Sequence, residues 1–265
     1  MSIQTYDNNQ AILWGEFVMS AYNSFDKKNL NPDPVDFPAG WDLVANLNVD
    51  ATFAIFDEKE FIGYIVRSQA DPTQVGIVFR GTDDIMDWID DFEFAMVDCD
   101  LIPAGGRCED GFYKMYKSLT AVDRKTGETL DLATYLIRFG NDVTYTVTGH
   151  SLGGALANLM TVVLASQKKK VQSYTFAAPM TGNHDFANTY NSLVPQNYRI
   201  YNQPDIVPKV PSGLLGYVQL GGGIEINSLL HPEIRKSIIC YHSLATYLNV
   251  LSSGKYPLGS CSAGK

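Results

Sequence analysis

The segment Thr-Tyr-Thr-Val-Thr-Gly-His-Ser-Leu-Gly-Gly-Ala-Leu-Ala occupies residues 144–157 and joins a β-rich run to a long apolar stretch. It contains the motif Gly-x-Ser-x-Gly, with the serine at position 151. Between a strand and a helix, this motif places its serine on a sharp turn with the hydroxyl above the sheet. Gly149 and Gly153 have no Cβ atom, so strand and helix can approach closely enough to make that turn. The segment therefore predicts a nucleophilic Ser151 at the end of a strand.

Strands and helices are expected to alternate along the rest of the chain. Continuous apolar or β-rich runs predict strands at residues 75–79, 144–147, 173–176 and 198–201, and a hairpin at 50–57 and 61–68. Apolar residues at helical spacing predict helices at residues 9–25, 112–119, 130–139 and 151–167. This alternation indicates an α/β fold with a central, mostly parallel sheet flanked by helices. No repeat or linker divides residues 1–265, so we expect a single domain.

Composition excludes two classes of protein. The 265 residues are 45% hydrophobic and 18% charged, which excludes an intrinsically disordered chain. With 20 Lys plus Arg against 29 Asp plus Glu, the formal net charge is −9, which argues against a nucleic-acid partner. Much of this charge is local, because residues 83–100 hold eight acidic side chains and no Lys or Arg. Outside that acidic segment the chain is nearly neutral.

The N-terminal residues and the cysteines indicate in which cellular compartment the protein is expected. Residues 1–7 have no basic region and no apolar core, so no signal peptide is visible, although a mature chain behind an added Met would look the same. We expect an extracellular protein, with a cytoplasmic one as the alternative. Cys99 and Cys108 flank a turn-rich segment, which predicts a disulfide between them, whereas a bridge between Cys240 and Cys261 stays open. No cysteine has metal-site or C-x-x-C spacing, no apolar run is long enough to span a membrane, and no metal or cofactor is expected.

A serine nucleophile needs a base to accept its proton. In this fold the chain order is serine, acid, histidine, so only His231 and His242 come late enough. His231 precedes a proline in a polar loop, whereas His242 stands on a loop just before a final apolar helix, and His242 is preferred. His150 is expected to be a packing residue, because neighbouring side chains at such a turn point apart.

Two aspartates compete for the acid that orients the base. Asp185 lies in a stretch that begins a helix, whereas Asp205 follows the strand predicted at residues 198–201 and stands between Pro204 and Pro208. Sites in open α/β sheets form beyond the carboxyl ends of the strands, so Asp205 is preferred.

Together these segments resemble the class 3 lipases, the fungal-type group of the α/β-hydrolases. The resemblance covers roughly residues 50–250 and is carried by the following segments: Gly149–Ala155, Val78–Thr82, Asp87–Asp91, Thr175–Pro179, Asp205–Pro211, and His242 with Tyr247. It implies Ser151, Asp205 and His242 as the catalytic triad. It further implies Thr82 and Leu152 as oxyanion donors and Asp91 as a support for Thr82.

The chain also departs from the pattern of this family. Members usually carry His-x-Gly-Phe, but here Glu109 precedes Asp110-Gly111-Phe112, and the N-terminal helix lacks the cysteine that ties the termini of many secreted fungal members. Both departures argue against a close fungal relationship and leave a bacterial or divergent member open. Neither affects the predicted triad.

Residues 83–98 are predicted to form a lid. Apolar side chains recur there at helical spacing between the aspartates: Ile85, Trp88, Ile89, Phe92 and Met96. The segment directly follows Thr82, so a mobile helix there would cover the acyl groove with its apolar face. The alternative is a fixed surface helix whose apolar face belongs to the core.

The expected activity is hydrolysis of the carboxylic esters of lipids, of the triacylglycerol lipase type, through an acyl-enzyme. A feruloyl or aryl esterase and a phospholipase on the same scaffold are the alternatives within enzymes. A catalytically silent, lipase-like binding protein is the alternative from another class. The expected partner is a lipid ester at an oil–water interface, and a monomer is expected.

Overall fold

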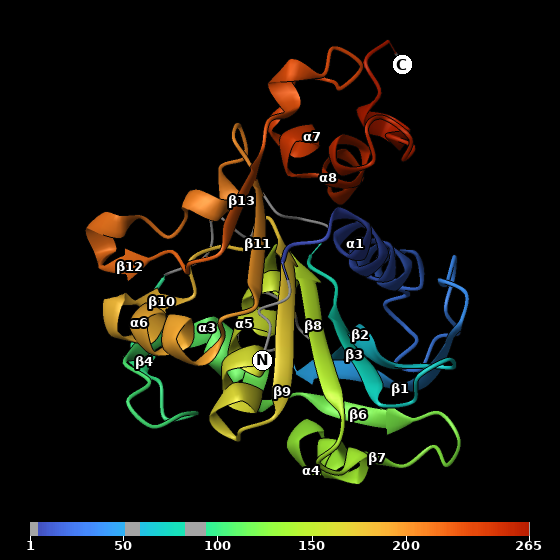
Figure 1. Ribbon diagram of the computed structural model, residues 1–265, viewed down its shortest axis with the longest axis vertical. Coiled ribbons are helices and arrows are strands. Elements are labelled where there is room, and N and C mark those ends of the chain that lie inside the picture. The colour runs from blue at the N-terminus through green and yellow to red at the C-terminus, as the bar shows by residue number, and fades with distance from the viewer. Residues whose placement is uncertain (1–4, 51–58, 83–93, 265) are drawn as a thin grey trace.

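A nine-stranded sheet organises the computed structural model, which describes residues 5–50, 59–82 and 94–264 (Figure 1). Its strands follow the order β13-β11-β9-β8-β3-β2-β1-β6-β7. Their bounds are β1 Trp41–Asp50, β2 Lys59–Ser68, β3 Gln74–Phe79, β6 Thr120–Asp123, β7 Thr129–Asp131, β8 Thr144–His150, β9 Lys170–Phe176, β11 Asn197–Asn202 and β13 Gly223–Ile226. The five strands β3, β8, β9, β11 and β13 pair in parallel, and the remaining pairs are antiparallel. The parallel half confirms the expected α/β class.

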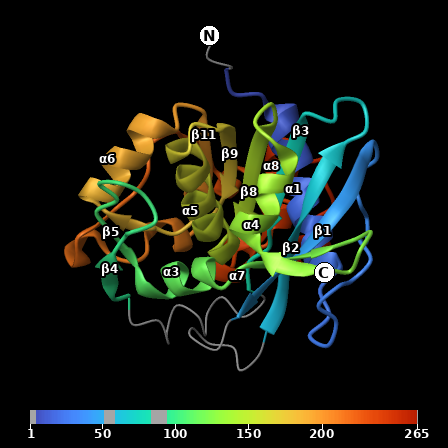
Figure 2. The same ribbon diagram turned by 90° about the horizontal axis from the view of Figure 1, so that it is seen from below.

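Helices cover both faces of this sheet. Their bounds are α1 Asn8–Asn23, α3 Asp110–Lys117, α4 Leu132–Leu136, α5 Leu152–Ser166, α6 His184–Leu193, α7 Ile238–His242 and α8 Leu244–Leu251. In Figures 1 and 2, α3, α5 and α6 lie on one side of the sheet, and α1 and α8 lie together on the other. Each side has its own apolar cluster, with α5 central to one and α1 and α8 to the other.

The central strands are buried as the sequence predicts. All residues of β3 after Gln74 are buried, and Thr146 to His150 of β8 are buried as well. A strand covered by helices on both faces can be apolar throughout, which is why Val75–Phe79 shows no alternation. These two strands end side by side, with Phe79 opposite Gly149, so Arg80 and Ser151 emerge at the same edge of the sheet.

Three expectations about local structure need correction. The first strand of the predicted hairpin lies at Trp41–Asp50, and residues 51–58 are outside the described parts of the chain. Most of the predicted lid also lies outside them, and its end, Met96–Asp98, is strand β4 and not helix. This strand belongs to a second sheet of order β12-β10-β5-β4, whose other members are β5 Arg107–Glu109, β10 Gly182–Asn183 and β12 Tyr217–Val218. That small sheet is formed by pairs too short to give a sequence signal.

The third correction concerns the cysteines. Cys99 and Cys108 are buried free thiols, and the disulfide of the structure joins Cys240 to Cys261. In the β4–β5 pair, Cys108 lies opposite Val97, so Cys99 is on the same face of the hairpin, and the two thiols are hydrogen-bonded neighbours that form no disulfide. No helix in the described parts of the chain is long and apolar enough to span a membrane.

A buried carboxyl group at the start of α3 makes stability depend on pH. Glu109 is 2% exposed, and its side chain accepts a hydrogen bond from the Phe112 N–H as the N-cap of that helix. Burial raises the pKa of Glu109 from 4.5 to about 7. The folded state therefore holds a proton that the unfolded state has already lost, so stability falls as the pH rises from 4.5 to about 7.

Glu109→Gln should remove this pH-dependent cost while keeping an oxygen for the cap. The difference in free energy of unfolding between the variant and the wild type should grow by about 3 kcal/mol in favour of the variant as the pH is raised from 4 to 8. Thermal unfolding followed by circular dichroism at both pH values measures the effect, with the exposed Glu128→Gln as control. An equal change in Tm at the two pH values would contradict the assignment.

Candidate active site

Ser151 stands on a strained turn between β8 and α5. Its φ of 57° and ψ of −128° lie in a region that residues other than glycine rarely adopt. The turn is tight because a Cβ atom on Gly149 would lie 2.2 Å from the carbonyl oxygen of Gly153, and one on Gly153 would lie 2.3 Å from that of Arg80. Both glycines are therefore required by close backbone approach, as the motif predicts.

His242 and Asp205 meet beside this turn. The Nδ1 atom of His242 lies 2.9 Å from Oδ2 of Asp205, and both residues are buried. The same carboxylate oxygen accepts a 2.7 Å hydrogen bond from the hydroxyl of Tyr247, and the Val207 N–H donates to Oδ1. Burial, followed by the charge of Asp205, raises the pKa of Tyr247 well above its usual value, so its hydroxyl stays a donor. The carboxylate is thus held from two sides and faces the imidazole.

Two buried functional atoms are left without a partner among the described residues. These are Oγ of Ser151 and Nε2 of His242. The structure shows no hydrogen bond between them, but hydrogen bonds of this kind are often long without substrate and tighten when it binds. Because Nδ1 of His242 faces Asp205, Nε2 is the nitrogen left to receive a proton.

The loop after β3 lies against Ser151. A Cβ atom on Gly81 would lie 3.0 Å from Cβ of Ser151, which brings the adjoining Thr82 next to the predicted nucleophile. Arg80 anchors the loop from beneath: it donates to the carbonyl oxygen of Gly81 at 2.7 Å and pairs with Glu60 at 3.0 Å. The predicted second donor, Leu152, is the first residue of α5, where the backbone N–H has no acceptor within the helix.

An apolar cavity of about 270 Å³ opens beside these groups. Thr82 and His242 contribute to its wall, and the other lining residues are mostly apolar or aromatic: Met19, Tyr22, His150, Ile239, Ser243 and Leu244. A larger hollow of about 810 Å³ lies at the opposite edge of the sheet, lined in part by Arg67, Asp123 and Arg138. It contains no histidine, and Asp123 and Arg138 already pair with each other there, so it offers no comparable chemistry.

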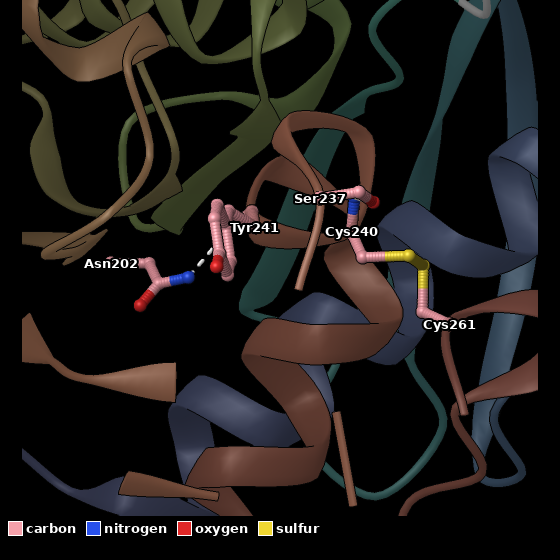
Figure 3. Close-up of a disulfide and its surroundings, with 5 residues drawn as sticks. All are labelled: Asn202, Ser237, Cys240, Tyr241 and Cys261. Atoms are coloured by element: carbon pink, nitrogen blue, oxygen red, sulfur yellow. Dashed lines mark hydrogen bonds between the residues drawn. A yellow bond between two sulfur atoms is a disulfide. The ribbon is translucent and has the colours of Figure 1, made fainter. Parts of the chain in front are cut away.

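The segment that carries His242 is fixed by two further contacts. The disulfide between Cys240 and Cys261 ties α7 to the C-terminal segment, and Nδ2 of Asn202 donates to the Tyr241 carbonyl oxygen at 2.8 Å (Figure 3). Asn202 ends β11, three residues before Asp205. The strand that leads to the predicted acid therefore also holds the segment of the predicted base.

The competing candidates lie elsewhere. Asp185 is exposed and lies near His184, and His231 contacts Glu233. Among the predicted lid and support residues, Ile85, Trp88, Ile89, Phe92 and Asp91 lie outside the described parts of the chain, so their roles stay predictions.

Sequence reasoning missed two contacts of His150, which it treated as a packing residue. His150 is buried, and its two ring nitrogens contact Tyr22 and the main chain of His242. No local pattern marks Tyr22, which lies on the predicted N-terminal helix among apolar residues. Tyr247 had one signal in the sequence: it stands five residues after His242, in the histidine segment that resembles the family.

Comparisons with known proteins agree with this geometry. The family pattern described as Lipase (class 3) matches residues 76–214, about half of the chain. A secreted mono- and diacylglycerol lipase 1 of Fusarium solani is 29% identical over 164 residues, which cover 62% of this chain and 47% of the relative. Phospholipase A1-IIalpha of Arabidopsis thaliana is 26% identical, with 78% of this chain and 56% of the relative covered. The chain spans about half the length of the curated relatives it matches.

Solved structures agree as well. A triacylglycerol lipase whose catalytic centre is described as a serine protease triad superposes with a TM-score of 0.64 at 26% identity. The match covers 82% of this chain and 79% of that protein. The matched region of the family pattern contains the elbow, the loop with Thr82 and the segment of Asp205. The chain therefore belongs to the class 3 lipase family.

Proposed function

We propose that this protein is a serine hydrolase that cleaves carboxylic esters of lipids through an acyl-enzyme. The observation that carries the proposal is the 2.9 Å contact between His242 and Asp205 beside the strained elbow of Ser151. A serine hydroxyl is a weak nucleophile until a base takes its proton, and this base is oriented by a buried carboxylate.

The reaction follows from these positions. Oγ of Ser151 attacks the ester carbonyl carbon while Nε2 of His242 takes the proton, and Asp205 stabilises the imidazolium. The backbone N–H groups of Thr82 and Leu152 donate to the oxyanion of the tetrahedral intermediate. His242 then protonates the leaving alcohol, and an acyl-enzyme remains. Water that gives its proton to His242 attacks the acyl carbon, and collapse of the second intermediate releases the acid and restores Ser151.

Apolar residues near His242 support a lipid substrate. Ile238 and Ile239, which begin α7, are 47% and 64% exposed, and Ile239 also lines the cavity beside His242. Exposed aliphatic side chains beside a site are expected where an apolar surface is bound. The named relatives act on acylglycerols or phospholipids, so an acylglycerol is the first candidate substrate and a phospholipid the second.

The setting of the reaction is also proposed. The disulfide between Cys240 and Cys261 and the secreted relative of Fusarium solani favour an extracellular protein. We expect a monomer that acts at an oil–water interface, with residues 83–93 as the covering lid.

A substrate panel tests the proposal. We expect turnover of nitrophenyl esters and of emulsified acylglycerols, with activity on long acyl chains and a rise in rate when the ester exceeds its solubility limit. Methyl ferulate and phosphatidylcholine serve as comparison substrates. Preference for methyl ferulate would identify an aryl esterase, preference for phosphatidylcholine a phospholipase, and absence of all turnover would overturn the proposed activity. A rate that saturates below the solubility limit, without a rise when droplets form, would contradict the interfacial role.

A further inference from the structure

Three consecutive hydrogen bonds link the loop after β3 to the main chain of His242. The Gly81 N–H donates to the hydroxyl of Tyr22 at 2.9 Å. That hydroxyl lies 2.8 Å from Nδ1 of His150, and Nε2 of the same ring lies 2.8 Å from the carbonyl oxygen of His242. We call these contacts the Tyr22–His150 chain.

The directions of these bonds follow from the chemistry of their ends. A carbonyl oxygen has no proton to give, so Nε2 of His150 carries the hydrogen and donates to His242. Burial, followed by the nearby His242, lowers the pKa of His150 well below its usual value, so its ring is neutral. Nδ1 is then an acceptor and receives the proton of the Tyr22 hydroxyl, which leaves a lone pair for the Gly81 N–H. Each group donates toward His242, and only one tautomer of His150 allows this.

The chain connects parts of the site that are far apart in sequence. Gly81 precedes Thr82, His150 precedes Ser151, and His242 is the predicted base. Tyr22 lies near the end of α1, 128 residues from His150. A Cβ atom on Gly81 would lie 2.4 Å from the Tyr22 hydroxyl, so the loop can come this close only because residue 81 is a glycine.

We propose that Tyr22 and His150 are positioning residues that hold the oxyanion loop and the base in one arrangement around Ser151. The role rests on the proposed function, because it assigns them to a reaction that uses Thr82, Ser151 and His242. Neither side chain acts on the substrate in this role. They act through the backbone of Gly81 and of His242.

The neutral ring of His150 serves the same reaction electrostatically. Its centroid lies 4.7 Å from that of His242, which must become positively charged when it takes the proton of Ser151. Among the described residues, the titratable groups that face His150 are Tyr22, His242 and Tyr247. The ring centroid of Tyr247 lies 6.2 Å from that of His150. A second positive ring at this distance would oppose that charge, so a neutral hydrogen-bonding ring suits the position.

Tyr22→Phe tests the chain with a small change. It removes the hydroxyl and keeps the ring, so kcat for a nitrophenyl ester should fall about tenfold while KM changes less than about twofold. The matched control is Tyr64→Phe, which removes the hydrogen bond from another buried tyrosine to the same helix, at Phe17. This control should leave kcat unchanged, which separates positioning of the site from general packing of α1.

Variants of His150 test the direction of the chain. His150→Gln keeps an N–H that reaches the His242 carbonyl oxygen, whereas His150→Ala removes both contacts. We expect a fall in kcat of about 100-fold for Ala and of about tenfold for Gln. Because Tyr22 and His150 share one hydrogen bond of the chain, the double variant with Tyr22→Phe and His150→Ala should lose less activity than the product of the two single losses.

The tautomer is measured directly by a long-range ¹H–¹⁵N spectrum of the histidine rings, assigned with His150→Gln. It should show a neutral His150 with its proton on Nε2. A positively charged ring, or a proton on Nδ1, would overturn the chain. If the wild type is active and Tyr22→Phe leaves kcat unchanged, the positioning role alone would be overturned. The same holds if the loss in the double variant equals the product of the two single losses. Absence of wild-type turnover on every ester would overturn the proposed function, and the role that rests on it.

Discussion

Ser151→Ala is expected to reduce kcat for ester hydrolysis by about 10⁵-fold or more, because no other group can form the acyl-enzyme in its place. The oxyanion donors and the base would remain, so a small residual rate above that of water is expected. Initial rates with a soluble nitrophenyl ester, measured on protein of verified folding, give the effect.

The same helix offers a matched control. Ser166 is the last residue of α5, and its hydroxyl bonds only to the carbonyl oxygen of Val163 among the described residues. Ser166→Ala should keep full activity. If Ser151→Ala kept more than about one hundredth of the wild-type kcat, the assignment of the nucleophile would be wrong.

Asp205→Asn is expected to lower kcat by about 10⁴-fold, as the equivalent change does in serine proteases. Oδ1 of Asp205 accepts from the Val207 N–H and Oδ2 faces Nδ1 of His242, so one amide oxygen cannot replace both carboxylate oxygens. With the oxygen toward Val207, the amide nitrogen would donate to Nδ1 of His242. The proton of the imidazole would then sit on Nε2, which could no longer accept the proton of Ser151.

Asp185→Asn is the matched control for this change, because Asp185 was the other candidate acid and is exposed. It should leave kcat within about twofold of the wild type. Comparable losses in the two variants would show that the effect of Asp205→Asn is not specific to the contact with His242.

The sequence predicted the parts of the fold that depend on local pattern. Val75–Phe79 is apolar throughout because β3 is covered on both faces, and the glycines around Ser151 reflect a turn made by adjoining residues. Strand β1 was missed in part because it contains Asn46 and Asn48, which are poor strand formers. Asn46 is accommodated by contacts with Asn31 and the Pro32 carbonyl oxygen, which no local pattern reveals.

The residues of the site also divide into those that the sequence could suggest and those that it could not. The chain order of serine, acid and histidine narrowed the bases to His231 and His242. The position of His242 before the final helix and of Asp205 after a strand then favoured these two residues, because the fold brings the ends of its strands to one edge. Tyr22 and His150 could not be chosen in this way, since their contact joins α1 to the end of β8 and depends on ring position and tautomer. The spacing of Cys99 and Cys108 correctly suggested that these two thiols are neighbours, but spacing does not decide which neighbouring cysteines form a disulfide.

Covalent labelling with diethyl p-nitrophenyl phosphate tests most directly whether Ser151 is the nucleophile. This reagent phosphorylates an activated serine and releases nitrophenol, so intact mass and peptide mapping report the number and place of the adducts. We predict one adduct per chain, on Ser151, with loss of esterase activity in proportion to labelling and no adduct in Ser151→Ala. An adduct on another residue, or equal labelling of the Ser151→Ala variant, would contradict the account.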